Sequence, residues 1–147
     1  MKTVRLLALS TTILVFGGPA FGAESRTAQA IRHSAPKGIT EALYTCIDKA
    51  GLDQTLLGKC VAAERGIQDA RLNKAYGQLM TKLDDRTKEA VKVAERAWLD
   101  FNVKTVAAET AIGGTNQVAN FDVANSELFR YCERANVLED YLFSVGE

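Results

Sequence analysis

The sequence predicts an all-α protein, a small antiparallel bundle of one short and three long helices with one disulfide. Apolar side chains recur three and four residues apart over much of the chain, the spacing of a buried helix face. The chain has only 2 Pro and 7% aromatic residues, and no stretch longer than a few residues alternates as a strand would. Its 147 residues suffice for one domain of ordinary size.

Residues 1–22 are predicted to be a signal peptide. Lys2 and Arg5 precede an uncharged apolar stretch at residues 6–16, and Ala20 and Gly22 suit cleavage by signal peptidase. The stretch is too short for a bilayer, which takes about 20 helical residues. An uncleaved anchor or a buried helix is the alternative. We therefore expect a periplasmic or secreted protein with no membrane anchor after cleavage.

Residues 23–37 are expected to form a flexible leader into a helical domain at residues 38–147. The leader is polar, contains Pro36 and shows no clear periodicity. The only histidine of the chain, His33, lies there, and a lone imidazole without neighbouring Cys or carboxylates makes no metal site.

The domain is expected to open with a short helix and a long one. Thr40 can cap the short helix, Gly51 ends it, and Asp53 can cap the long helix, which runs to about Leu83. The apolar stripe of the long helix shifts from Leu56, Cys60, Ala63, Ile67 and Ala70 to Leu72, Tyr76, Leu79 and Leu83. Such a drift suits a helix that packs first on one neighbour and then on another.

Two further long helices are expected to form an antiparallel hairpin. The first starts near Asp84 and stops at Gly113 and Gly114. Its predicted core stripe is Val91, Ala94, Trp98, Phe101, Thr105, Ala108 and Ile112. The stripe of the second is Phe121, Ala124, Leu128, Tyr131, Ala135, Leu138 and Leu142. Residues 113–120 between them read GGTNQVAN, a polar link short enough to imply an antiparallel pair.

Three cysteines, Cys46, Cys60 and Cys132, allow three single pairings. Export would place them where disulfides form and persist. Cys46 and Cys60 flank the turn between the first two helices, so their nearness in sequence favours a bridge between them. Cys132 is then expected to be a half-buried, inert thiol. Three free thiols are the alternative.

The residues show no recognisable catalytic or cofactor site. With one His outside the predicted domain there is no Ser–His or Cys–His pair, and there is no glycine-rich phosphate loop and no CxxC. Basic and acidic residues number 18 each, and no basic patch is interleaved with aromatics, which argues against a nucleic-acid partner. No catalytic, metal or cofactor site is therefore expected, and an enzyme of unfamiliar type is the weaker hypothesis.

One set of polar residues accompanies the apolar stripe of the long second helix. It comprises Glu64, Asp69, Asn73 and Tyr76. Polar groups beside a core need partners, and Arg96 and Arg134 on the other two long helices could supply them. Two interpretations stay open: a hydrogen-bond network that fixes the register of the helices, and an exposed recognition stripe.

These residues also carry a resemblance to a known family. Glu64, Asp69, Leu72, Asn73 and Tyr76, following Cys46 and Cys60, match the pattern C…C…E…D..LN..Y. Ala94, Arg96, Ala97, Trp98 and Phe101 match AQRAW..[YF]RD..C; Gly113, Gly114 and Thr115 match a GGS; Tyr131 and Arg134 fall at a closing T..R…L. Over roughly residues 43–142 the chain resembles the LprI-type lysozyme-inhibitor domain, a family of small, exported, mostly helical bacterial proteins with disulfides.

The chain departs from the family pattern at several positions. Glu95 stands where the family has Gln, and Asn102 and Val103 replace its Arg-Asp. Two family cysteines fall at Val106 and near Ser126, in the two hairpin helices. Their joint loss fits one missing disulfide, and the lost Arg-Asp puts in doubt any function carried by those groups.

The resemblance implies a non-enzymatic binding domain that binds and blocks a lysozyme or another peptidoglycan hydrolase. Lysozyme clefts carry two catalytic carboxylates and bind a sugar chain, so a loop with amide and hydroxyl groups can imitate the sugar. The expected target-binding loop is Gly113, Gly114, Thr115, Asn116 and Gln117, with an ordinary connector as the alternative. The motif residues Glu64, Asp69, Asn73, Tyr76, Trp98 and Arg134 are expected to be structural. The alternative function is a structural or stress-related envelope protein with no lysozyme target.

Overall fold

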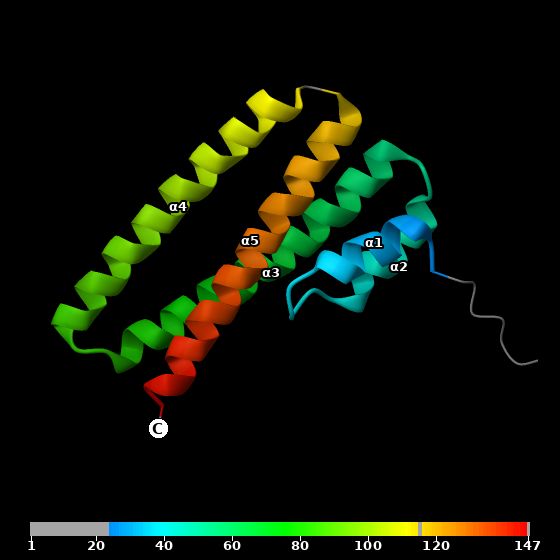
Figure 1. The fold of residues 1–147 in the computed structure, drawn as a ribbon. Helices are drawn as coiled ribbons and strands as arrows, with labels where there is room; N and C mark the ends of the chain where they lie inside the picture. The colour runs from blue at the N-terminus through cyan, green and yellow to red at the C-terminus, as the bar shows by residue number, and fades with distance from the viewer. Residues whose placement is uncertain (1–23, 115, 147) are drawn as a thin grey trace, which may run out of the picture.

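The computed structural model describes residues 24–114 and 116–146 (Figure 1). Within these ranges the chain forms five helices: α1 (Arg26–Ser34), α2 (Glu41–Ala50), α3 (Gln54–Lys82), α4 (Asp85–Gly113) and α5 (Gln117–Ser144). The all-α class and the three long helices predicted from the sequence are confirmed. The predicted signal peptide, residues 1–22, lies outside the described residues, and so does Thr115.

The structure has a second short helix, α1, in the segment expected to be a flexible leader. The Ser25 side chain accepts a hydrogen bond from the Ala28 N–H at 3.2 Å and caps this helix. Ala28 and Ile31 are buried in the core, whereas the outer face of α1 is polar. Only two inward-facing apolar residues mark the helix, which is why periodicity did not reveal it.

The predicted caps at the starts of α3 and α4 are confirmed, whereas Thr40 stands at the N-cap position of α2 without a capping bond from its side chain. Asp53 accepts from the backbone N–H groups of Thr55 and Leu56 at the start of α3, and Asp84 accepts from Thr87 at the start of α4. Gly51 ends α2 with a φ of 60°, a left-handed backbone conformation that glycine adopts without steric cost.

The centre of the protein is the pair α3 and α5, against which the other helices are placed (Figure 1). Arg65 bonds Glu127 and, further along both helices, Arg71 bonds Glu139, so α3 and α5 run in the same direction. Helix α2 packs on α3, α1 packs on α2, and α4 runs antiparallel to α5 as the predicted hairpin requires.

The predicted stripe of α5 is confirmed. Leu128, Tyr131, Ala135 and Leu138 are buried, and Phe121, Ala124 and Leu142 pack partly buried against the two halves of the core.

The predicted faces of α3 and α4 are wrong in part. On α3 one continuous face is buried, at Leu57, Cys60, Val61, Glu64, Gln68, Leu72, Ala75 and Leu79, whereas Leu56 and Ile67 are exposed. On α4 the buried residues are Glu95 and Asn102, and Phe101 and Ile112 are 56% and 87% exposed. Both helices bury polar side chains. A prediction based on the spacing of apolar residues does not assign polar side chains to the core.

The predicted disulfide between Cys46 and Cys60 is present, with 5.7 Å between the two Cα atoms. It ties α2 to the second turn of α3. Cys132 is a free thiol and is fully buried rather than half-buried. Its Sγ donates to the Lys37 carbonyl at 3.3 Å, and burial raises the pKa of the thiol, so Cys132 packs as an inert part of the core.

Candidate functional site

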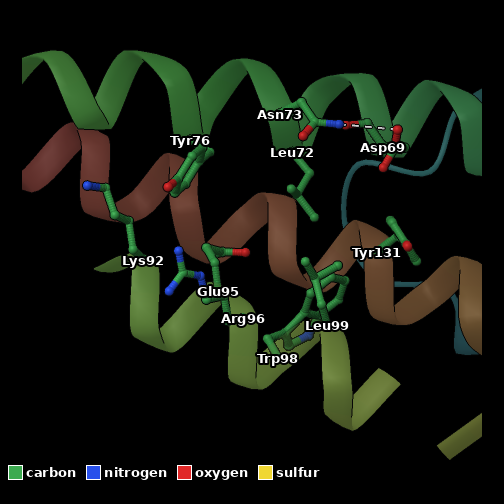
Figure 2. Close-up of a pocket in the computed structure, with 10 residues that line it drawn as sticks. All are labelled: Asp69, Leu72, Asn73, Tyr76, Lys92, Glu95, Arg96, Trp98, Leu99 and Tyr131. Carbon is green, nitrogen blue, oxygen red and sulfur yellow. Dashed lines mark hydrogen bonds between the residues drawn. The ribbon is translucent and has the colours of Figure 1, made fainter. Parts of the chain in front are cut away.

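Four of the motif residues surround one hollow between α3 and α4, which we call the α3–α4 groove (Figure 2). Asp69, Asn73 and Tyr76 reach it from α3, and Trp98 reaches it from α4. The hollow has a volume of about 380 Å³. Its other lining residues are Leu72, Lys92, Glu95, Arg96, Leu99 and Tyr131. Helix α5 runs behind the hollow and forms its base.

The groove is open because α4 packs mainly on α5 and stands away from the middle of α3 (Figure 1). Trp98 packs edge to face on Tyr131 of α5, with 5.2 Å between ring centroids. Trp98, which was predicted on the core stripe of α4, is only partly buried against the core. The same edge-to-face contact fixes the position of the indole in the groove.

Polar side chains hold α4 on α5. Arg134 Nε donates to Glu95 at 2.8 Å, and the two side chains are only 14% and 11% exposed. One turn along α5, Arg130 donates to Asn102 at 2.8 Å and to Glu109 at 2.7 Å. Charge-assisted bonds of this kind are stronger than neutral ones. The residues Glu95 and Asn102, at which the chain departs from the family pattern, thus both serve to attach α4.

The polar motif divides into two groups with different surroundings. Glu64 is buried away from the groove, where it accepts from the Thr40 N–H at 2.9 Å and the Thr40 hydroxyl at 2.6 Å. Arg134 pairs with Glu95 rather than with Asp69 or Asn73. The single interhelical network considered from the sequence is therefore not formed. Glu64 and Arg134 tie helices together, whereas the remaining motif residues face the groove.

The two ends of the groove carry opposite charges (Figure 2). Lys92 and Tyr76 lie at one end, and Asp69 and Tyr131 lie at the other. Asn73 donates through Nδ2 to the Asp69 carbonyl at 2.9 Å and to its carboxylate at 3.2 Å. Sequence reasoning missed Lys92 and Tyr131 as site residues, because their nearness to the motif depends on how α4 leans.

The expected target-binding loop forms the tip of the α4–α5 hairpin. Gly113 is the last residue of α4, Gly114 has a φ of 80°, and Gln117 is the first residue of α5. Asn116 caps α5 by accepting from the Ala119 N–H at 2.9 Å. The link is therefore shorter than the predicted residues 113–120, and one amide oxygen in it is already engaged.

The tip also carries apolar groups that the sequence interpretation left out. Ile112 and Val118 are 87% and 59% exposed and line a second hollow of about 440 Å³ beside Gly113 and Asn116. The described tip residues Gly113, Gly114, Asn116 and Gln117 are all exposed. The described residues of the tip therefore offer a surface of apolar and amide groups. Thr115 lies outside the described residues.

A third polar cluster fastens the segment before α2 to the central helices. Arg71 of α3 donates through Nε to Glu139 of α5 at 2.7 Å, and Gln68 donates to the Gly38 carbonyl at 2.8 Å. The bond from Arg71 lowers the pKa of the Glu139 carboxyl. Asn136 donates to the Lys37 carbonyl at 2.8 Å. This cluster therefore attaches Lys37 and Gly38, at the junction of the predicted leader and the predicted domain, to the central helices.

The family model described as Lysozyme inhibitor LprI matches residues 46–138. The chain belongs to the LprI family. The match begins at the first cysteine of the disulfide and includes the whole α3–α4 groove and the α4–α5 tip. The LprI resemblance read from the short motifs is thereby confirmed. No curated protein and no solved structure matches the chain.

Membership of the LprI family indicates a binding domain of the lysozyme-inhibitor type. Among residues 24–114 and 116–146, no helix is long and apolar enough to cross a membrane. In the same ranges no three His, Cys, Asp or Glu side chains gather into a metal-binding group.

Proposed function

We propose that this LprI-family protein is exported to the periplasm or beyond the cell, where it binds a lysozyme or another peptidoglycan hydrolase and inhibits it without catalysis of its own. The observation that carries the proposal is the family match over residues 46–138. The signal-peptide pattern of residues 1–22 supports export.

The tip of the α4–α5 hairpin is the part that we propose to enter the hydrolase cleft. It stands at one end of the molecule, where two helices meet in a narrow turn (Figure 1). Its backbone amides and the Asn116 and Gln117 side chains can replace hydrogen bonds that the cleft makes to a sugar chain. The exposed Ile112 and Val118 can displace water from the apolar walls of the cleft.

The test is inhibition of bacterial cell lysis, measured by turbidity, with the mature wild-type protein and a tip variant. The variant Thr115→Ala, Asn116→Ser, Gln117→Ala removes the hydrogen-bonding side chains, while serine keeps the cap that α5 needs. We expect inhibition to weaken by about 1–3 kcal/mol for each group buried on binding. The matched control is Thr45→Ala with Gln78→Ala, two exposed residues on α2 and α3.

Full inhibition by the tip variant would show that another surface binds the hydrolase. Failure of the wild-type protein to inhibit any lysozyme would remove the proposal and leave the structural or stress-related envelope function. Circular dichroism of each variant separates loss of binding from loss of the fold.

A further inference from the structure

We propose that the α3–α4 groove binds an acidic sugar, that is, a pyranose ring that carries a carboxylate. The proposal does not rest on hydrolase inhibition. Leu99, the groove residue nearest the tip on α4, is separated from Gly113 by about 20 Å at the rise of an α-helix. The two sites can therefore be present or absent independently.

The size and the base of the groove suit one small ring. A volume of about 380 Å³ lies within the range of small-molecule sites, which are mostly apolar with a few polar groups that fix orientation. Leu72, Trp98 and Leu99 supply apolar surface in the middle of the groove (Figure 2). A pyranose ring has a face of C–H groups that packs on such surface, and aromatic rings contribute the largest contact area.

One end of the groove carries positive charge that the protein does not neutralise. Arg96 makes no ion pair or hydrogen bond with any residue that the structure describes. The adjacent acid, Glu95, is engaged by Arg134, and Lys92 makes only a 3.5 Å contact with Glu89. A guanidinium group binds a carboxylate through two parallel hydrogen bonds, so Arg96 is the expected anchor of an anionic substituent.

The other end of the groove suits hydroxyl or amide groups. Asn73 uses its NH₂ group on Asp69, which leaves the Asn73 amide oxygen and the Asp69 carboxylate as acceptors on the rim. Sugar hydroxyls donate to such acceptors. The Asp69 charge repels a carboxylate, so the acidic substituent is directed toward Arg96 and the hydroxyl edge toward Asp69. A short peptide offers a carboxylate and apolar side chains but no ring of hydroxyls.

The experiment is a titration of the mature protein with N-acetylmuramic acid and with N-acetylglucosamine, which lacks the lactyl carboxylate. Trp98 is the only tryptophan and lines the groove, so its fluorescence reports occupancy directly. Calorimetry supplies a second readout. We expect saturable binding of N-acetylmuramic acid and at least about tenfold weaker binding of N-acetylglucosamine, as expected for the loss of one charged hydrogen-bonded contact.

Two variants with matched controls assign the binding to the groove. Arg96→Gln is expected to weaken N-acetylmuramic acid binding to the level of N-acetylglucosamine, whereas Arg86→Gln, an exposed arginine of α4 outside the groove, leaves it unchanged. Asp69→Asn is expected to weaken N-acetylglucosamine binding, because a charged acceptor for the hydroxyls is lost, and to weaken N-acetylmuramic acid binding less, because the repulsion of its carboxylate is lost as well. Its control, Asp100→Asn, changes an exposed acid of α4 and leaves both affinities intact.

The proposal is overturned if neither sugar binds, if both bind equally, or if Arg96→Gln has no effect. Binding of the dipeptide alanyl-alanine in place of the sugars would equally overturn the sugar assignment. The tip variant is expected to keep full sugar binding, so failure of hydrolase inhibition and failure of sugar binding are distinguished.

Discussion

The attachment of α4 can be tested at the ion pair between Glu95 and Arg134. Replacing Glu95 by alanine leaves the Arg134 guanidinium nearly buried without its carboxylate. Breaking a buried pair costs about 3–5 kcal/mol, and the low end, about 3 kcal/mol, applies because 14% and 11% of the two side chains remain exposed. We therefore expect Glu95→Ala to lower the free energy of unfolding by about 3 kcal/mol.

Two controls separate the pair from the general effect of a substitution on α4. Glu95→Gln keeps an oxygen acceptor for Arg134 and removes only the charge, so it is expected to cost about 1 kcal/mol. Glu89→Ala removes an exposed acid of the same helix and is expected to cost less than about 0.5 kcal/mol.

The assay is unfolding in urea, followed by far-ultraviolet circular dichroism and by Trp98 fluorescence. The dichroism reports all helices, whereas Trp98 reports the contact of α4 with Tyr131. In Glu95→Ala the fluorescence transition is expected to precede the dichroism transition, because α4 loses its attachment first. If Glu95→Ala is no less stable than Glu89→Ala, the ion pair does not hold α4 and the reasoning is refuted.

Three further predictions concern other parts of the fold. Alkylation of the native protein should modify no thiol and alkylation after unfolding should modify one, because Cys132 is buried and the other two cysteines form the disulfide; three reactive thiols would contradict the bridge. Gly38→Ala should destabilise the protein by about 1–3 kcal/mol in thermal unfolding, because Gly38 has a φ of 109° and an added Cβ would overlap the Arg71 guanidinium; an unchanged midpoint would refute this. The Arg71 bond lowers the pKa of Glu139 below its unfolded value, so its stabilisation is present above the unfolded pKa, about 4.3, and is lost as the pH falls through the folded pKa. Glu139→Gln should flatten this acid limb in unfolding measured from pH 6 to pH 2, and an unchanged limb would show that Glu139 does not contribute.

The sequence predicted the features of the fold that depend on neighbouring residues. The caps at Asp53 and Asp84 and the stop at Gly51 follow from residues a few positions apart, and the Cys46–Cys60 bridge joins residues separated by 14 positions. The buried stripe of α5 was also correct, because every one of its positions is apolar or aromatic.

The predictions that were wrong concern helix faces on which a polar residue occupies a buried position. Gln68 and Glu95 occupy core-facing positions of α3 and α4, and apolar periodicity assigns such residues to the surface. Their burial is compensated by partners distant in sequence, such as Gly38 and Arg134. The residues next to Gln68 and Glu95 in the sequence do not indicate which distant residues become their partners.

The candidate site was predicted in part. The motif identified Asp69, Asn73, Tyr76 and Trp98, which do lie around one groove. Their common surroundings depend on the way α4 leans on α5, which the spacing of residues within each helix does not determine. For the same reason the sequence could not separate these residues from Glu64, which is buried against Thr40.

The position of the disulfide decides which parts of the molecule respond to the redox state of the surroundings. The bridge lies between α2 and α3, whereas Cys132, on α5, is a free thiol. Reduction is therefore expected to loosen the N-terminal helices more than the α4–α5 hairpin. The hairpin is held by ion pairs such as Arg130–Glu109, with side chains 15% and 30% exposed. Dissolved salt screens such partly buried pairs much less than exposed ones, so neither a reductant nor a moderate rise in ionic strength is expected to separate α4 from α5.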